Sequence, residues 1–170
     1  MAESSRRAAR PTDKGGLPNL LFAVAAAETP PDVLRGRANE VLVVFPWGSL
    51  LRGALALDGT AAAGIAALLA PDGLVRAFVS ITDRDAATAE LRPLTVADTD
   101  AIARRWTAHG LTLTCFEPAS AETIDATGST WGRRLTAGRR GRAAGPASTG
   151  ERSVWTLEVR RDTGPGRRPG

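Results

Sequence analysis

Short apolar runs alternate with stretches of helical spacing along most of the 170-residue chain. Strands are predicted where a short run is apolar or alternates, at Leu20–Ala25, Val41–Phe45, Leu74–Ile81, Leu111–Phe116 and Ser153–Val159. Helices are predicted from spacing and end signals, at Met1–Arg10, Thr60–Leu69, Val96–His109, Ser120–Ala126 and Trp131–Ala137. Strands that alternate with helices predict a layered α/β sheet.

Proline and glycine mark the breaks between these elements. Pro11–Pro18 and the Pro-rich stretch Thr29–Arg37 are predicted connections. The triplet Pro71-Asp72-Gly73 should end one helix before the next strand begins, and Gly110 should stop another helix. The last residues, Arg160–Gly170, are rich in Gly, Pro and Arg, which predicts a disordered basic tail.

Composition limits the class of protein. With 43% apolar residues, the chain can bury one core. A single cysteine, Cys115, excludes an internal disulfide and a cysteine-based zinc site, and we expect no metal. The apolar run Leu20–Ala27 is too short to span a membrane, and the N-terminus has no apolar core of a signal peptide. We therefore expect a cytoplasmic protein.

The formal net charge is +4, which favours an acidic partner such as nucleic acid. Lys14 is the only lysine, however, and the other basic residues are arginines in a chain rich in Ala and Gly. That usage is typical of a GC-rich genome. The positions of the arginines therefore carry more information than their number.

Two tryptophans occur beside residues that hold a backbone tightly. In open α/β sheets, ligands bind beyond the carboxyl ends of strands, and Pro46-Trp47-Gly48-Ser49 follows a predicted strand directly. Proline and glycine would fix the direction of this indole; the alternative is a tryptophan that plugs the top of the sheet. Trp131 lies among small residues before Arg133-Arg134, where the alternative is a buried Trp on a helix with a solvated basic face.

Three blocks resemble the aminoglycoside-resistance methyltransferases that modify N1 of adenine 1408 in 16S rRNA. They are Phe45-Pro46-Trp47-Gly48-Ser49-Leu50-Leu51-Arg52, Ala25-Ala26-Ala27-Glu28 and Ser129-Thr130-Trp131-Gly132-Arg133-Arg134-Leu135. The first block is highly specific, whereas the second alone would be weak. The resemblance runs in register from about Met1 to Val159, so residues 1–159 are expected to form a partial methyltransferase domain.

The resemblance implies a role for each matching residue. Trp47 and Trp131 match the pair that sandwiches the flipped adenine. S-adenosylmethionine (SAM) would contact positions matched by Ala27, Glu28, Val44, Ser49 and Ser129. The RNA backbone would be gripped by Arg6, Arg7, Arg10, Arg134, Arg139 and Arg140. The implied partner is 16S rRNA within the 30S ribosomal subunit, and we expect a monomer.

The resemblance also implies a Rossmann-like class I fold that lacks its first strand, first helix and second strand. No Gly-rich turn follows a predicted strand, and no acidic residue stands where the cofactor ribose would need one. In the implied sheet, the lacking strands would sit between Leu20–Ala25 and Val41–Phe45. Our hypothesis is that Met1 is an internal methionine taken as a start, or that the gene is truncated.

The sequence leaves three candidate functions. The first is a SAM-dependent rRNA adenine-N1 methyltransferase that confers aminoglycoside resistance. The second is a catalytically inactive RNA-binding remnant of one. The third, a different α/β enzyme such as a hydrolase, lacks a motif: there is no G-x-S-x-G, H-E-x-x-H or Walker loop. His109, at a predicted helix end, is expected to be structural.

Overall fold

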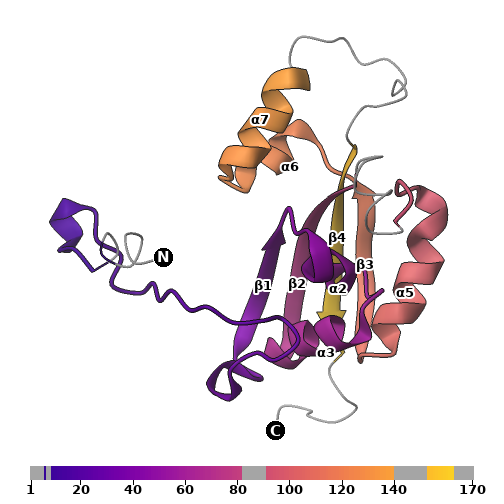
Figure 1. Ribbon diagram of the computed structural model, residues 1–170, viewed down its shortest axis with the longest axis horizontal. Helices are drawn as coiled ribbons and strands as arrows, with labels where there is room; N and C mark the ends of the chain where they lie inside the picture. The colour runs from indigo at the N-terminus through magenta and orange to yellow at the C-terminus, as the bar shows by residue number, and fades with distance from the viewer. Residues whose placement is uncertain (1–5, 7–8, 82–90, 140–152, 163–170) are drawn as a thin grey trace, which may run out of the picture.

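The computed structural model describes residue 6 and residues 9–81, 91–139 and 153–162. Within these residues, four strands and five α-helices form the fold (Figure 1). In chain order they are β1 (Ala38–Val44), α2 (Gly48–Ala54), α3 (Gly59–Leu68), β2 (Leu69–Ile81), α5 (Thr99–Thr107), β3 (Leu111–Pro118), α6 (Ala121–Ala126), α7 (Thr130–Arg139) and β4 (Ser153–Arg161). Short 3-10 turns lie at Thr12–Lys14, Asp32–Leu34 and Val96–Asp98.

The strands form one mixed sheet in the order β1-β2-β4-β3. β1 pairs with β2 in parallel, and β4 runs antiparallel to both of its neighbours, β2 and β3. Consequently β1, β2 and β3 all point the same way, and their carboxyl ends lie at the same end of the sheet (Figure 1). The predicted α/β class is thus confirmed, with a mixed sheet.

The main core lies on the sheet face that carries the alternating residues Val75, Ala77 and Val79, each fully buried. Helices α2, α3 and α5 contribute to the same core. In α5, Ile102 and Trp106 are spaced by one helical turn and both are buried, as expected of an amphipathic helix on a sheet.

On the opposite face, the described residues cover the sheet near the carboxyl ends of the strands. There Ile124 of α6 packs with Ala119 and Val154, and Phe45 joins this smaller cluster. Lower on the same face, Arg76 is partly exposed and bridges Glu40 at 3.0 Å and Glu158 at 2.7 Å. The polar surface confines α6 and the adjoining α7 to one end of the sheet.

Helix α3 begins with a side-chain cap and is built from small residues. The Asp58 carboxylate accepts hydrogen bonds from the backbone N–H groups of Thr60 and Ala61 at 3.0 and 3.1 Å. At Gly64 the backbone of the N-terminal segment comes very close, because an added Cβ there would lie 1.7 Å from the Ala27 carbonyl oxygen. This contact holds the turn at Ala27–Glu28 against the helix.

Four of the five predicted strands are confirmed, as are four predicted helices. β1 contains Val41–Val44, β2 contains Leu74–Ile81, β3 contains Leu111–Phe116, and β4 contains Ser153–Val159. The predicted helices correspond to α3, to the 3-10 turn plus α5, to α6 and to α7. Gly110 adopts a φ of 72° just beyond α5, as predicted for the stop.

The strand predicted at Leu20–Ala25 is wrong. These residues have no regular structure, and Leu21 and Val24 are 84% and 81% exposed. An apolar run becomes a strand only when a neighbouring strand satisfies its backbone groups. Among the described residues, β1 is the last strand at that edge of the sheet, and the segment is not paired with it. In Figure 1 it runs away from the sheet instead.

Two further predictions about boundaries are wrong. Pro71–Gly73 lies inside β2 rather than before it. Ala38 of β1 pairs with Leu69, but Glu40 pairs with Leu74, so the residues between Leu69 and Leu74 form an irregularity in the strand. Arg160 and Arg161 belong to β4 and not to a tail. The guanidinium of Arg160 donates a hydrogen bond of 2.8 Å to the Asp72 carbonyl, which ties the strand end to that irregularity.

The remaining N-terminal and C-terminal predictions fall mostly outside the described residues. Of the helix predicted at Met1–Arg10, only Arg6, Ala9 and Arg10 are described, and Arg6 alone is helical. Residues 163–170 of the predicted tail are not described. Helix α2 was not predicted, because two glycines in seven residues lower its helix propensity. It forms because Leu51, Gly53 and Ala54 are buried against the rest of the core.

We expect Gly64→Ala to lower the free energy of unfolding by about 1–3 kcal/mol, because the new methyl group would displace the Ala27 carbonyl. Gly59→Ala is the matched control in the same helix, since its Cβ would meet nothing within 4 Å. Urea unfolding should show that Gly59→Ala is neutral or stabilising. Equal stabilisation by both substitutions would mean that Ala27 does not contact α3 in solution.

Candidate functional site

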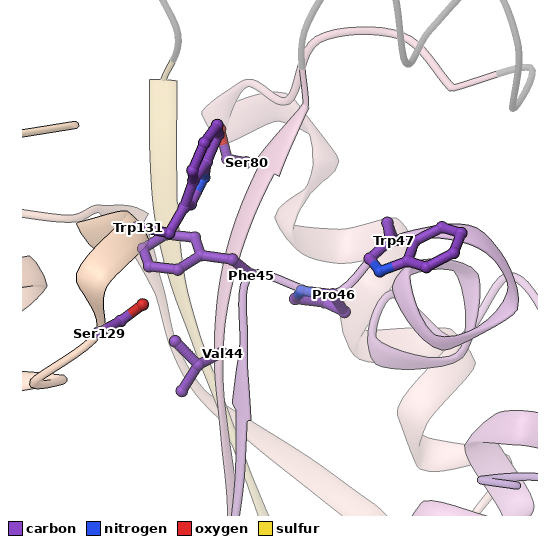
Figure 2. Close-up of a pocket in the computed structure, with 7 residues that line it drawn as sticks. All are labelled: Val44, Phe45, Pro46, Trp47, Ser80, Ser129 and Trp131. Carbon is purple, nitrogen blue, oxygen red and sulfur yellow. The ribbon is translucent and has the colours of Figure 1, made fainter. Parts of the chain in front are cut away.

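A cavity of about 390 Å³ opens at the carboxyl ends of the strands. Its walls come from the end of β1 and the turn after it, the end of β2, and the start of α7 (Figure 2). The residues that line it are Val44, Phe45, Pro46, Trp47, Ser80, Ser129 and Trp131. The three segments are far apart in sequence and meet only because β1, β2 and β3 are parallel to one another.

The turn after β1 is fixed by one hydrogen bond and by a strained residue. The backbone N–H of Phe45 donates to the Phe78 carbonyl at 2.8 Å, and Phe45 then adopts a φ of 49°. A bulky residue in this left-handed region costs energy and is found where the surroundings enforce it, often at functional sites. Pro46 is buried behind the turn, and Trp47 projects outward with 84% of its surface exposed.

Trp131 is positioned by the packing of α7 on α6. At its neighbour Gly132, an added Cβ would lie 3.1 Å from the Ile124 carbonyl oxygen, so even an alanine there would have to push the two helices slightly apart. The Ser129 hydroxyl accepts a hydrogen bond of 3.4 Å from the Gly132 N–H at the start of the helix. Trp131 is 42% exposed at the rim of the cavity.

The two indoles of the cavity do not stack on each other. In Figure 2 they lie on opposite sides of Phe45 and Pro46, with Trp131 on the α7 side and Trp47 over α2. Both side chains nevertheless line the same cavity. Phe45 and Pro46, which also line the cavity, lie between them.

Ser80 lines the cavity and was missed by the sequence analysis. It lies at the carboxyl end of β2, next to the last residue of the strand. Ligands bind beyond the carboxyl ends of strands in such sheets. Ser80 could have been predicted on that basis, because it is the single serine that follows the apolar run Ala77-Phe78-Val79. Phe45 and Pro46 were noted only as part of a motif, and they too form the wall.

The residues predicted to hold SAM do not gather in one place. Val44 and Ser129 line the cavity. Ala27 and Glu28 are half-buried at the turn beside α3, and Ser49 is exposed in the first turn of α2. None of these last three residues lines the cavity. The described residues therefore do not fit a complete SAM site.

The predicted RNA-binding arginines fall into two separate regions. Arg134 is exposed on α7, and Arg139 ends that helix. Arg6 and Arg10 are exposed on the N-terminal segment, which lies away from α7 in Figure 1. Arg7 and Arg140 lie outside the described residues. Of the predicted arginines that the structure describes, Arg134 and Arg139 belong to α7, the helix whose first turn contributes Trp131 to the cavity.

The ionisable groups with shifted pKa values lie outside the cavity. Burial, followed by the nearby Glu117 carboxylate, raises the pKa of the Cys115 thiol, which keeps it protonated and a poor nucleophile. The hydrogen bond that Arg76 donates to Glu158 raises the pKa of the guanidinium. His109 packs its ring edge-on against Trp106 at 6.0 Å between centroids, as expected of a structural residue.

The described residues hold no group of three or more His, Cys, Asp or Glu side chains that could bind a metal ion. In the same part of the chain, no single helix is long and apolar enough to cross a membrane, although α2 and α3, bent by 70°, pass together on length and composition.

The sequence model of the family described as NpmA, 16S rRNA (adenine(1408)-N(1))-methyltransferase, matches residues 1–147. The chain belongs to this family. It is 35% identical over 140 residues to the 16S rRNA (adenine(1408)-N(1))-methyltransferase of Streptoalloteichus hindustanus, a match that covers 80% of this chain and 64% of that protein. An rRNA methyltransferase of Saccharopolyspora hirsuta is 34% identical over 139 residues, with 79% and 88% covered.

Solved structures of family members share the fold. The 16S rRNA methyltransferase KamB superposes with a TM-score of 0.75 at 28% identity, over 95% of this chain and 72% of that chain. A W203A mutant of the 16S rRNA (adenine(1408)-N(1))-methyltransferase of Catenulisporales acidiphilia, with cosubstrate SAM, gives 0.68 at 27% identity, over 99% and 73%. The chain thus has the mixed α/β fold of these methyltransferases while spanning 64% of one relative and about 70% of the solved chains.

Proposed function

We propose that this chain is part of a 16S rRNA (adenine(1408)-N(1))-methyltransferase that confers aminoglycoside resistance. It would be the part that binds the target adenine and the RNA backbone. The observation that supports it most directly is a cavity lined by both Trp47 and Trp131, in a member of that family. The partner would be 16S rRNA in the 30S subunit, which the chain would meet in the cytoplasm as a monomer.

The proposed role of the two tryptophans is to hold the target adenine. A base inside an RNA helix hides N1, so it must be taken out of the stack. An aromatic platform contributes about 1–3 kcal/mol per stacked base, and the two indoles that line the cavity would supply one platform for each face of the adenine. The indoles lie apart in the free chain, so the slot would close around the base.

The same stacking would favour the reaction itself. Methylation at N1 makes the adenine ring cationic, and indole faces attract a cation. The attraction grows as charge develops, so it stabilises the transition state more than the ground state. N1 carries its own lone pair and needs no general base. This agrees with the described lining of the cavity, which contains no ionisable side chain.

The arginines of α7 would bind phosphates without reading sequence. Arg134 follows Trp131 by three residues, so it projects near the same side of the helix. A methyl group and a positive charge on the adenine would then repel a polycationic aminoglycoside. Arg6 and Arg10 would reach a separate part of the RNA.

SAM is the methyl donor implied for the family, and we propose that Val44 and Ser129 contribute to its pocket. We also propose that the part of the relatives outside the matched share is their first strand, first helix and second strand. The unpaired apolar segment Leu20–Ala25 and the lack of a Gly-rich turn support this. The scattering of Ala27, Glu28 and Ser49 favours a second candidate function, an RNA-binding remnant that cannot methylate.

One experiment separates the two candidates. The purified chain is incubated with 30S subunits and SAM, and reverse transcription reports whether synthesis stops at the target adenine. SAM binding is measured in parallel by calorimetry, where we expect no micromolar affinity. Stops would establish the enzyme. Binding to 30S without stops would establish the remnant, and failure to bind 30S would refute both.

Trp47→Ala and Trp131→Ala should each weaken binding of free adenosine by about 5- to 150-fold, as expected from the loss of one stacking face. Quenching of tryptophan fluorescence measures this affinity. Trp47→Phe keeps an aromatic ring and should retain much of it. If either alanine variant binds adenosine as the wild type does, that indole is not part of a slot.

Arg134→Glu should weaken binding to 30S subunits and reduce the slope of log affinity against log salt by about 1 or more. Arg104→Glu makes the same change of net charge at an exposed position of α5, outside the cavity, and should have a small effect. A filter-binding series from low to high salt measures both. An equal loss in the two variants would show that only net charge matters.

A further inference from the structure

The Ser80 hydroxyl is buried and has no partner among the described residues. Its Oγ has less than 1 Å² of accessible surface and makes no hydrogen bond, although the residue lines the cavity with Trp131 and Phe45. A buried hydroxyl without a partner destabilises a fold, because it has lost water and gained nothing. Such a group in a cavity wall is expected to bond to whatever fills the cavity.

The other buried polar atoms that lack a partner among the described residues are explained by the bulk of their side chains. They are Trp106 Nε1, Trp155 Nε1 and Arg161 Nε. Each belongs to a large side chain whose apolar part fills space in the fold. Serine differs from alanine only by the hydroxyl, so packing alone gives no reason for Ser80. The residues before it on β2, Phe78 and Val79, are apolar and buried.

The strand pairing places Ser80 at the gap where β1 ends. Val44 opposite Phe78 is the last β1–β2 pair, and β4 pairs with Ser80 through Val154 on the other side. Phe78, Ser80 and Val154 share one face of the sheet by their alternation, the face on which α6 packs. Rotation about one bond moves Oγ among three staggered positions, so the hydroxyl can turn to a ligand.

We propose that Ser80 is a specificity-determining residue that hydrogen-bonds the Hoogsteen edge of the bound adenine. This rests on the proposed function. Because N1 must stay free to receive the methyl group, the protein can recognise only the other polar atoms of the base. A serine hydroxyl is both a donor and an acceptor, so it can donate to N7 and accept from the N6 amine.

Three nucleosides test this on the 170-residue chain. They are adenosine, purine riboside, which lacks the N6 amine, and 7-deazaadenosine, which lacks N7. By tryptophan quenching, the wild type should bind adenosine about 2- to 10-fold more tightly than either analogue, the range for a net hydrogen bond. Ser80→Ala should bind all three alike, and Ser80→Thr, which keeps the hydroxyl, should restore the preference.

Urea unfolding separates this role from a structural one. Ser80→Ala removes an unpartnered hydroxyl, so its unfolding midpoint should stay the same or rise. Thr107→Ala is the control, because its hydroxyl donates to the Ala103 carbonyl at 2.9 Å on an exposed part of α5. That variant should keep the adenosine preference. A lower midpoint for Ser80→Ala would overturn the proposal.

The outcomes also distinguish failure of Ser80 from failure of the slot. Adenosine binding that needs Trp47, with a preference unchanged in Ser80→Ala, would refute the role of Ser80 alone. Equal binding of the three nucleosides by the wild type would do the same. No binding of any nucleoside by the wild type would remove the proposed slot, and the role of Ser80 with it.

Discussion

The register between β1 and β2 is the constraint on which the cavity depends. Val44 lies opposite Phe78, and the N–H of Phe45 then donates to the Phe78 carbonyl at 2.8 Å. A slip of one residue would turn every side chain of β1 to the other face. Val43 would leave the core, and Trp47 would no longer start α2 beside the cavity. The left-handed Phe45 is tolerated because this pairing enforces it.

Much of the fold could be predicted from local patterns, because most elements bury a face that the pattern itself marks. The prediction fails where a strand needs a partner: Leu20–Ala25 has the same apolar signature as β1, yet it is exposed. Pairing is a property of two segments, and one segment's composition cannot supply it. Helix α2 shows the reverse case, since packing of Leu51 and Ala54 overrides a poor propensity.

The candidate site likewise contains residues that local sequence predicts and residues that it does not. Trp47 and Trp131 could be found from sequence because their flanking residues form recognisable motifs, and the structure brings both to one cavity. Ser80 carries no motif, and its importance comes from a hydroxyl that the fold leaves unpartnered. Glu28 was assigned to SAM binding by resemblance. In the structure, the turn at Ala27–Glu28 packs against α3 at Gly64. Positions set by tertiary contacts could not be read from local sequence.

The uncharged stretch from Leu17 to Ala27 has a consequence for the behaviour of the chain in concentrated solution. Its large apolar side chains face water, beside a fold whose main core is buried on one side of the sheet. The rate at which two chains associate through such a segment rises with the square of the protein concentration. The unfolding equilibrium of a single chain does not depend on that concentration. Solubility and thermal stability of this protein should therefore respond to different residues, and a folded chain could still precipitate or be retained by chaperones that bind extended apolar peptides.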